Sequence, residues 1–484
     1  MRKFKKIAAL SLALAIGSSL AACSGDITTT ESTTEEEVTE ATEEDTVEDT
    51  EEATADESAA TAKADFSTDG KVLNIQCFDD SFASRLSTYY PGYEANDPND
   101  VTAGGKIGDV EVNFVITPNA DNEYQNKLDQ LLPYNAEAAE DDRIDLFMLE
   151  DDYALKYVNT DLTLPVADLG IVDSELVNQY KYTKDMVTDH NGNMKGVAWE
   201  ATPGALIYSR DAAIEILGSD DPDTVQEAVA DWDTFNETAK RVADIGFSMT
   251  ASTDDTLRVF LDNVSSPWVV DGKIVVDANL KKWAVMTKEQ VDANMTGTCD
   301  AWSDDWTAGF YPEGKVFCYF GPVWLVDSFM CDDDPLSIAG QGGWGIVEGP
   351  QNFTWGDTWM CAANGTDNPA LVADIMRKFT VDTEMMTDFA KNDKKFVNNK
   401  SAMDVLAADK TYRDDALGGQ NAFDILKECA DKVDKINISE YDQGCIESFK
   451  AAMKDYFEGN TDSYEDALDA FYKSVTAKYP ELTY

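Results

Sequence analysis

The chain has 484 residues and a formal net charge of -55 at pH 7, and hydrophobic residues make up 43% of it. Because single cores stop growing at roughly 250 to 300 residues, a chain of this length should fold around more than one core. A sequence pI near 4.1 excludes an ordinary nucleic-acid binder, since phosphate binding needs basic patches. The single histidine, His190, removes most metal and acid–base chemistry that uses paired imidazoles.

The first 22 residues have the pattern of an export signal. Four basic residues open the chain, an apolar run from Ile7 to Ala22 follows, and small residues precede Cys23. This run is too short for a membrane-spanning helix between such flanks. The segment Leu20–Cys23 resembles a bacterial lipobox, whose cysteine is diacylated and becomes the mature N-terminus; the alternative is an ordinary signal peptide with an incidental cysteine. We expect residues 1–22 to be a lipoprotein signal peptide and Cys23 to be the lipidation site, which anchors an exported protein to the outer face of the cell membrane.

Residues 23–65 have the composition of an acidic tether. From Ser24 to Asp65 there are sixteen acidic side chains and one basic one, Lys63, with almost no large apolar residue. Such a segment cannot bury enough surface to offset its ordering entropy, and its like charges extend it. We expect a disordered linker of the kind that suits the thick cell wall of a Gram-positive bacterium.

Seven cysteines remain after Cys23, and none has the C-x-x-C or C-x-x-H spacing of a thiolate zinc site. We therefore expect buried thiols, with no metal site and no cofactor. If a disulfide forms, Cys299, Cys318 and Cys331 are the best candidates for it, and the odd number leaves at least one thiol free.

From Phe66 onward, short strand-like runs alternate with longer helical ones. The segments 71–77, 110–116 and 144–149 read as strands, the last as a continuous apolar run typical of a buried parallel sheet, and 122–132 has helical spacing. This alternation predicts an α/β fold. Further segments with one apolar helical face are Trp232–Ala243, Ala370–Phe379, Ala422–Val433, Ile446–Phe457 and Tyr464–Lys478. Three of these helices have visible starts: Asn368-Pro369, Ser439 before the Ile446 helix, and Asp462-Ser463 before the last one.

Several motifs follow one another in the order of a known family. They are Gly192–Glu200, Ala205–Gly218, Trp232–Lys240, Gly314–Trp324, Asp357–Asn364 and Asn368–Phe379. Together they resemble family 1 extracellular solute-binding proteins, the maltose-binding-protein-like sugar-binding components of ABC importers. The similarity covers roughly residues 66–484, and a chance match of one short motif would not keep this order.

The resemblance implies a two-lobed, periplasmic-binding-protein-like fold with the ligand cleft between the lobes. Lobe 1 is expected to comprise residues 66–196 plus 360–412, and lobe 2 residues 197–359 plus 413–484. Such a monomeric protein binds by closing on its ligand and delivers it to the permease subunits of the transporter. Because proteins of this family bind and do not catalyse, we expect no catalytic residues. The ligand that the resemblance implies is a carbohydrate, and an oligosaccharide fits best.

This sequence departs from the family pattern at a few positions. Ala198 and Ile144 stand where prolines are usual. Insertions around Gly92–Lys106 and Val269–Cys299 are expected to be loops that reshape the cleft.

Candidate ligand contacts follow two predicted strands. Phe78, Asp79 and Asp80 come after the first strand, and Asp152 comes shortly after the strand that ends at Leu149. Open α/β sheets bind ligands beyond the carboxyl ends of their strands, which favours these residues. The alternative is that they are solvated loop residues of an acidic protein.

Aromatic residues supply the second half of the predicted site, since sugar C–H faces stack on rings while hydroxyls bind polar groups. Trp199 with its neighbour Glu200 lies at the crossing into lobe 2, and Trp324 and Trp355 lie in glycine-flanked segments. The remaining predicted contacts are Asp357 and Tyr441, and Trp268 and Trp306 are weaker stacking candidates. Trp283, Trp302 and Trp344 are expected to be core or interface residues.

Two other functions compete with sugar binding. A surface glycoside hydrolase would use paired carboxylates such as Asp304 and Asp305, but adjacency is common in so acidic a chain, and no nucleophile-elbow, P-loop or zinc-protease motif occurs. A binder of polyamines or basic peptides would use an acidic, aromatic cleft on the same fold. Its affinity should fall with ionic strength, whereas sugar affinity should barely change.

Overall fold

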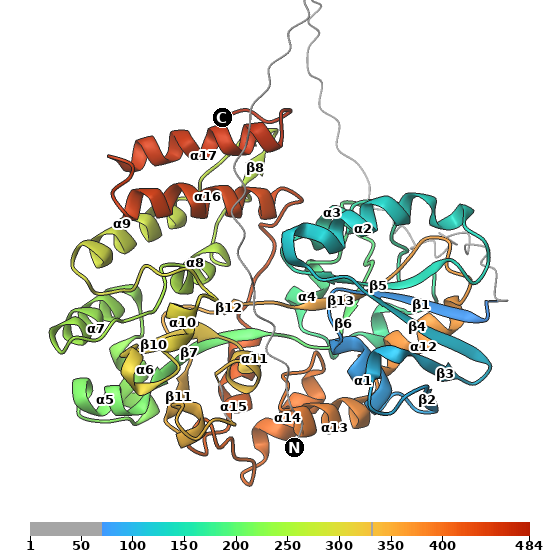
Figure 1. Ribbon diagram of the computed structural model, residues 1–484, viewed down its shortest axis with the longest axis horizontal. Coiled ribbons are helices and arrows are strands. Elements are labelled where there is room, and N and C mark those ends of the chain that lie inside the picture. The colour runs from blue at the N-terminus through green and yellow to red at the C-terminus, as the bar shows by residue number, and fades with distance from the viewer. Residues whose placement is uncertain (1–69, 331–332) are drawn as a thin grey trace, which may run out of the picture. The chain divides into compact units, whose positions relative to one another are not determined.

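Two main β-sheets, both visible in Figure 1, form the framework of the computed structural model, which describes residues 70–330 and 333–484. The predicted signal peptide, the lipidation site Cys23, the tether and Cys331 lie outside the described residues. The described part of the chain covers the two predicted lobes except for residues 66–69, 331 and 332.

The first lobe is built on a seven-stranded sheet of order β2-β3-β4-β1-β5-β13-β6. Its strands are β1 (Val72–Cys77), β2 (Tyr93–Ala95), β3 (Gly105–Ile107), β4 (Val110–Ile116), β5 (Ile144–Glu150), β6 (Val197–Ala198) and β13 (Thr358–Ala362). Helices α1 (Ser81–Tyr89), α2 (Glu123–Leu131), α3 (Ala154–Val158), α4 (Lys181–Asp185) and α12 (Pro369–Lys378) accompany it. Strand β1 is parallel to β4 and β5, which confirms the predicted parallel arrangement. The carboxyl ends of these strands consequently meet at one edge of the sheet.

The sequence of strand β5 is almost continuously apolar because both faces of the strand are buried. Leu146 and Met148 belong to one core cluster, whereas Phe147 and Leu149 belong to another with Tyr124 of α2. Successive side chains of a strand point to opposite faces, so a strand covered on both faces is apolar at every position. Figure 1 shows α2 and α3 on one side of this sheet and α12 on the other.

The second lobe is built on a four-stranded antiparallel sheet in which β7 pairs with β10, β11 and β12. The strands are β7 (Pro203–Ser209), β10 (Cys318–Gly321), β11 (Trp344–Val347) and β12 (Phe353–Thr354). The helices of this part are α5 (Arg210–Leu217), α6 (Pro222–Ala228), α7 (Trp232–Asp244), α8 (Asp254–Leu261), α9 (Ala278–Asp292), α10 (Asp304–Ala308), α11 (Val323–Ser328), α16 (Asp442–Phe457) and α17 (Tyr464–Lys478). A short ribbon of β8 (Val269–Val270) and β9 (Lys273–Ile274) completes it.

Several helix starts seen in the structure follow capping chemistry, and Ser463 and Pro369 are among the predicted ones. Asp231 accepts a hydrogen bond from the Thr234 backbone N–H at the start of α7, and Ser463 caps α17 in the same way. Pro369 occupies the first turn of α12, as its fixed φ favours. The helix expected to begin at Ile446 is longer, because the side chain of Ser439 pairs with that of Asp442, where α16 starts.

Three further helices follow the last strand of both sheets in the chain: α13 (Thr383–Asp393), α14 (Lys400–Ala408) and α15 (Ala422–Ala430). Helix α14 packs against both α13 and α15, and α15 packs against β7 (Figure 1). One core cluster includes residues of the first sheet, such as Leu146, and of the second, such as Ile207 and Ile346. The residue boundaries proposed for the two lobes stay a prediction.

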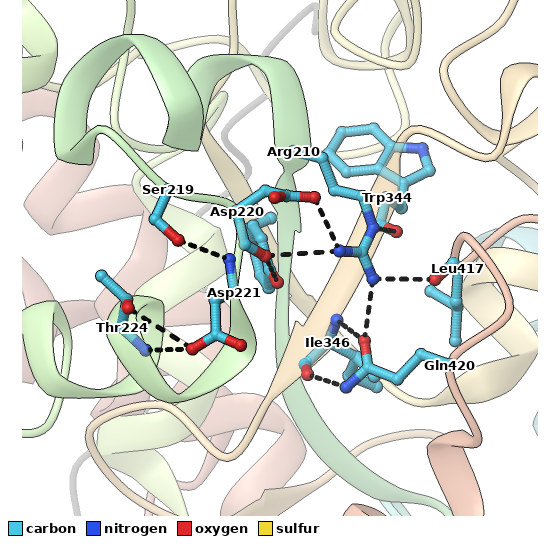
Figure 2. A network of polar contacts seen from close by, with 10 residues as sticks. Arg210, Ser219, Asp220, Asp221, Thr224, Trp344, Ile346, Leu417 and Gln420 are labelled. Atoms are coloured by element: carbon cyan, nitrogen blue, oxygen red, sulfur yellow. Dashed lines mark hydrogen bonds and ion pairs between the residues drawn. The ribbon is translucent and has the colours of Figure 1, made fainter.

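Arg210, the first residue of α5, ties three segments of this second lobe together (Figure 2). Its guanidinium donates to the carbonyl oxygens of Trp344 at 2.8 Å and Leu417 at 2.9 Å, and pairs with the Asp220 carboxylate at 3.1 Å. The neighbouring Gln420 side chain bonds both the N–H and the C=O of Ile346. Arg210 and Gln420 thereby satisfy backbone groups on the free edge of β11, which would otherwise be open to pairing.

Two sequence expectations are wrong. The insertions around Gly92–Lys106 and Val269–Cys299 are not simply loops, because the first contains β2 and part of β3 and the second contains β8, β9 and the 15-residue helix α9. Leu280, Trp283 and Ala284 of α9 are buried at helical spacing, so burial in the second core stabilises it.

Five of the six described cysteines are buried thiols, as expected, and the sixth is partly exposed. Cys77, Cys318, Cys361, Cys429 and Cys445 are free and buried, and Cys299 is free and partly exposed. Cys299 and Cys318 are therefore not joined to each other. Among residues 70–330 and 333–484, no helix combines the length and apolar character required to cross a bilayer.

Candidate ligand-binding site

A cavity of about 460 Å³, called the first cavity below, lies where the carboxyl ends of β1 and β5 face α11 and the loop after β12. Its lining residues are Phe78, Asp79, Ser81, Phe82, Arg85, Met148, Glu150, Trp199, Glu200, Trp302, Trp324, Ser328, Phe329, Trp355, Gly356, Thr358 and Lys395. Both lobes contribute to this set. The volume falls within the range of roughly 300 to 1,000 Å³ that is usual for small-molecule sites.

Four aromatic rings of the second lobe form one wall of the first cavity. Trp302 and Trp324 lie nearly parallel with ring centroids 6.2 Å apart, and Trp355 meets Trp324 edge-on at 4.8 Å. Phe329 contacts Trp302 at 5.0 Å. Trp302 is 46% and Phe329 47% exposed. Large apolar side chains gathered at an open cavity are typical of a ligand-binding surface.

Local backbone geometry holds this aromatic wall in place. The Trp324 indole N–H donates to the Trp355 carbonyl oxygen at 3.1 Å. Gly356 follows with φ +75°, and a Cβ there would lie 3.3 Å from the Trp324 ring. Only glycine adopts this conformation at little cost and permits the ring to approach so closely. The Trp324–Trp355 pair is consequently pre-organised.

The opposite wall is polar and is built from α1, the end of β5 and the crossing segment directly after β6. The Glu200 carboxylate accepts from the Trp199 indole N–H at 3.0 Å and from the Arg85 guanidinium at 3.3 Å. Arg85 and Glu200 form an ion pair with side chains only 15% and 13% exposed. The Asp79 carboxylate accepts from the Ser81 backbone N–H at 2.9 Å, which fixes it at the start of α1.

Two carboxyl groups of this wall have altered pKa values. Burial and the neighbouring carboxylates Asp152, Asp151 and Asp79 raise the pKa of Glu150 to about 8, against the opposing effect of the hydrogen bond from Asn119. Burial also raises the pKa of Asp79. Glu150 is therefore largely protonated at neutral pH, where it can donate as well as accept a hydrogen bond.

Six of the ten predicted contact residues line the first cavity: Phe78, Asp79, Trp199, Glu200, Trp324 and Trp355. The structure brings these residues together from α11 and from the segments that directly follow β1, β6 and β12. Trp199 is 4% exposed, and its ring packs on Phe82 at 5.3 Å. Their role in binding a ligand stays a prediction.

The other four predicted residues lie elsewhere. Asp80 is exposed just before α1, and Asp152 is exposed beside a second cavity. Asp357 is fully buried, where its carboxylate accepts from Thr202 at 2.8 Å and from the Thr354 hydroxyl. Tyr441 packs edge-on against Tyr479 in a separate groove. Burial raises the pKa of Asp357 to about 6, although the hydrogen bonds from Thr202 and Thr354 act in the opposite direction.

The structure also corrects the assignment of several tryptophans. Trp302, expected in a core or interface, is half-exposed in the aromatic wall, whereas Trp283 and Trp344 are buried as expected. The weaker stacking candidates Trp268 and Trp306 are both buried. Trp302 lies in the polar segment Asp300–Asp305, and this lack of apolar neighbours was the available signal of its exposure.

Sequence reasoning also missed Arg85, Phe329 and Lys395. Arg85 is one helical turn beyond Ser81, so its place beside the carboxyl end of β1 follows only once α1 is recognised. Lys395 comes from the segment after α13 and reaches Asp327 and Ser328 of α11 at 3.5 and 3.3 Å. Such long-range contacts leave no local pattern. Within the described residues, no group of three or more potential ligands could hold a metal ion.

Comparison with known families identifies the class of protein. A family model described as a bacterial extracellular solute-binding protein matches residues 102–417. The chain belongs to this family. Members of the bacterial extracellular solute-binding family are binding proteins rather than enzymes, and the family description implies an exported protein. No curated protein sequence matches the chain.

Solved structures share the fold of this solute-binding protein. An extracellular solute-binding protein of family 1 aligns with a TM-score of 0.67 and 18% identity, covering 84% of this chain and 99% of the other. The binding protein associated with an ABC transporter of B. animalis subsp. lactis Bl-04, in complex with β-1,6-galactobiose, aligns with a TM-score of 0.61 and 17% identity over 86% and 99%. The lacto-N-biose-binding protein of Bifidobacterium longum aligns with a TM-score of 0.60 and 14% identity over 85% and 98%. These similarities establish the two-lobed α/β architecture.

Proposed function

We propose that this protein captures a carbohydrate of oligosaccharide length in the first cavity and delivers it to the permease of an ABC transporter. The observation that carries the proposal is the pairing of an aromatic wall in one lobe with a polar wall in the other. Sugar rings present C–H faces that pack on aromatic rings and hydroxyl groups that need both donors and acceptors. Trp302, Trp324 and Trp355 supply the first kind of contact, and Asp79 and Glu150 supply the second.

The charges of the first cavity favour a neutral ligand over a cation. Glu200 is paired with Arg85 and Lys395 with Asp327, so these four charges are mutually compensated. The raised pKa of Glu150 further lowers the negative charge at neutral pH. Two proteins of similar structure are solved in complex with disaccharides, β-1,6-galactobiose and lacto-N-biose, in agreement with the proposed ligand class.

We also propose that the protein acts as a monomer in which the two lobes close on the ligand, since both lobes line the first cavity. Lipidation at Cys23 would hold it on the outer face of the membrane of a Gram-positive cell, with residues 23–65 as the tether. Two or more acyl chains suffice for stable anchoring.

A thermal-shift screen tests the ligand class. We expect a sugar in a panel of mono- and oligosaccharides, polyamines and basic peptides to stabilise the protein, by about 2.7 kcal/mol at about 100 times its Kd. The affinity of this sugar should be nearly independent of ionic strength. Stabilisation by amines or peptides alone, weakening with added salt, would replace the carbohydrate proposal by a cationic ligand.

Cell fractionation tests the anchor. The variant Cys23→Ala should be released from the membrane fraction, whereas Thr28→Ala, a few residues downstream, should remain there. If Cys23→Ala stays as firmly attached as the parent, lipidation at this position is wrong.

A further inference from the structure

A second cavity, of about 430 Å³, adjoins the first and extends into the second lobe. Trp302 and Trp355 belong to the walls of both cavities. The second cavity continues between α8, which supplies Leu257 and Arg258, and α16, which supplies Ala451, with the loop before Trp302 as a further wall. Apart from Trp302, Trp355 and Asp152, none of the residues proposed so far as ligand contacts lines this second cavity.

Like the first cavity, the second cavity is lined by aromatic rings together with charged side chains, several of which form ion pairs. The Arg258 guanidinium lies over the Trp355 ring, 4.5 Å from its centroid, so one face of this ring is covered by a hydrogen-bond donor. The cations across the cavity are already paired: Lys450 with Asp254 at 2.8 Å and Lys454 with Asp300. A neutral ligand rich in hydroxyl groups suits such a surface better than an ion, because paired charges still offer donors and acceptors.

Trp302 separates the two cavities in an unusual backbone conformation. Its φ is +70°, a left-handed conformation that is uncommon and strained for bulky residues. The hydrogen bond from the Trp306 backbone N–H to the Ser303 side chain, at 3.2 Å, fixes the start of α10 directly after it. Strained positions of this kind cluster at ligand clamps. The half-exposed ring is thus held at the boundary at a cost in both strain and solvation.

We propose that the two cavities are two parts of one binding groove, so that an oligosaccharide passes Trp302 and places further sugar units in the second cavity. This inference rests on the proposed carbohydrate function and adds the expected length and path of the ligand. Units in the first cavity meet the polar wall of Glu150 and Asp79. Units in the second cavity meet Arg258 and the α16 surface.

The experiment fills the second cavity with a large side chain and measures the effect on sugar affinity. Ala451 is exposed on α16 and lines the second cavity but not the first, so Ala451→Trp fills the former without touching the latter. Ala470 is exposed on α17 and lines none of the five cavities described, so Ala470→Trp is the matched control. Calorimetry measures the affinity of each full-length protein for glucose, maltose and maltotetraose and for galactose and β-1,6-galactobiose, and melting without ligand checks folding.

We expect the wild type to bind the longer member of the better series at least tenfold more tightly than its monosaccharide. Ala451→Trp should reduce this preference to about one, and Ala470→Trp should keep it. Equal affinity of the wild type for short and long sugars, or an undiminished preference in Ala451→Trp, would overturn the extended groove while leaving carbohydrate binding intact. If none of these sugars nor any in the wider panel binds the wild type, the proposed function itself fails.

Discussion

At the scale of single residues, exposure separates the tryptophans that pack in the core from those that line a cavity. Trp344 is fully buried in β11, whereas Trp324 is partly exposed and lines the first cavity beside Trp302. Both residues follow glycine-containing segments, so sequence alone gives them similar surroundings. The difference arises from the fold around them, because Tyr319 packs on Trp344 at 5.9 Å while one side of Trp324 faces open space.

The first prediction uses this pair. Trp324→Ala should weaken binding of the best sugar by roughly 2 kcal/mol, about thirtyfold, because a stacked aromatic at a desolvated contact is lost. Trp344→Ala should instead lower the free energy of unfolding by roughly 3 to 5 kcal/mol, because it leaves a cavity in the core. Calorimetry at a temperature where both variants are folded gives the affinities. Unchanged affinity in Trp324→Ala would remove this residue from the site.

Glu150 leads to a second prediction, on pH dependence. Its pKa rises from about 4.5 in the unfolded chain to about 8 in the folded protein, so the folded state holds the proton more tightly. The resulting stabilisation is fully present below pH 4.5 and is lost as the pH rises to 8. We expect Glu150→Gln, which keeps an acceptor for Asn119 and never ionises, to lose less stability between pH 5 and 8 than the wild type.

The control for this titration is Glu227→Gln, a change at an exposed position of α6. Melting temperatures of the three proteins measured from pH 5 to 8 should set Glu150→Gln apart from both others. Parallel curves for the wild type and Glu150→Gln would show that Glu150 does not take up a proton in the folded state.

At the scale of elements, the sequence predicted those that satisfy their own local rules. Strand β5 was visible as a continuous apolar run, and α17 was predicted with its bounds at Tyr464 and Lys478 because its cap and apolar face agree. Helix α9 was missed although Leu280 and Trp283 have helical spacing, because the segment was considered an insertion relative to a family pattern. The comparison with the family pattern therefore led us to overlook α9, which the helical spacing of its apolar residues indicated.

The edge of the second sheet gives the third prediction. Arg210 makes directed hydrogen bonds to Trp344, Leu417 and Asp220 (Figure 2), and a lysine cannot reach all of them with one ammonium group. Arg210→Lys should therefore lower the free energy of unfolding by about 2 kcal/mol. Arg413→Lys, at an exposed position, should change it by no more than about 0.5 kcal/mol. Urea denaturation compares the two, and equal midpoints would show that the Arg210 contacts are energetically minor.

At the scale of the whole molecule, the sequence could predict where a cavity lies, whereas the full set of residues that line it could not be predicted. Positions at the ends of strands pointed to Phe78 and Asp79, because the topology of parallel sheets fixes where such ends lie. Asp357 shows the limit: its side chain is turned inward to Thr202 and Thr354, which no local pattern reveals. Arg85 and Lys395 reach the first cavity from segments that are distant along the chain, so only the assembled fold brings them together.

The last prediction concerns how the lobes are joined. The described residues belong to one compact unit, and the chain passes between the sheets more than once, from β6 to β7 and from β12 to β13. The Ala201 backbone N–H also donates to the Phe396 carbonyl at 3.0 Å, and that of Asn398 to the Trp199 carbonyl. Cutting the chain at one crossing therefore leaves the others to hold both lobes together.

Limited proteolysis should accordingly yield one resistant fragment that begins near Phe66, because the acidic composition before it offers no core to protect the chain. Its melting temperature should equal that of the protein that keeps residues 23–65, since the composition of these residues offers almost no large apolar side chain to bury. Deletion of residues 413–484 should instead unfold the second lobe, because Phe449 and Phe471 of this segment pack on Trp268 in its core. Two independently stable fragments divided near Gly196 would contradict a core shared by both sheets, and the lobes would then fold as separate domains.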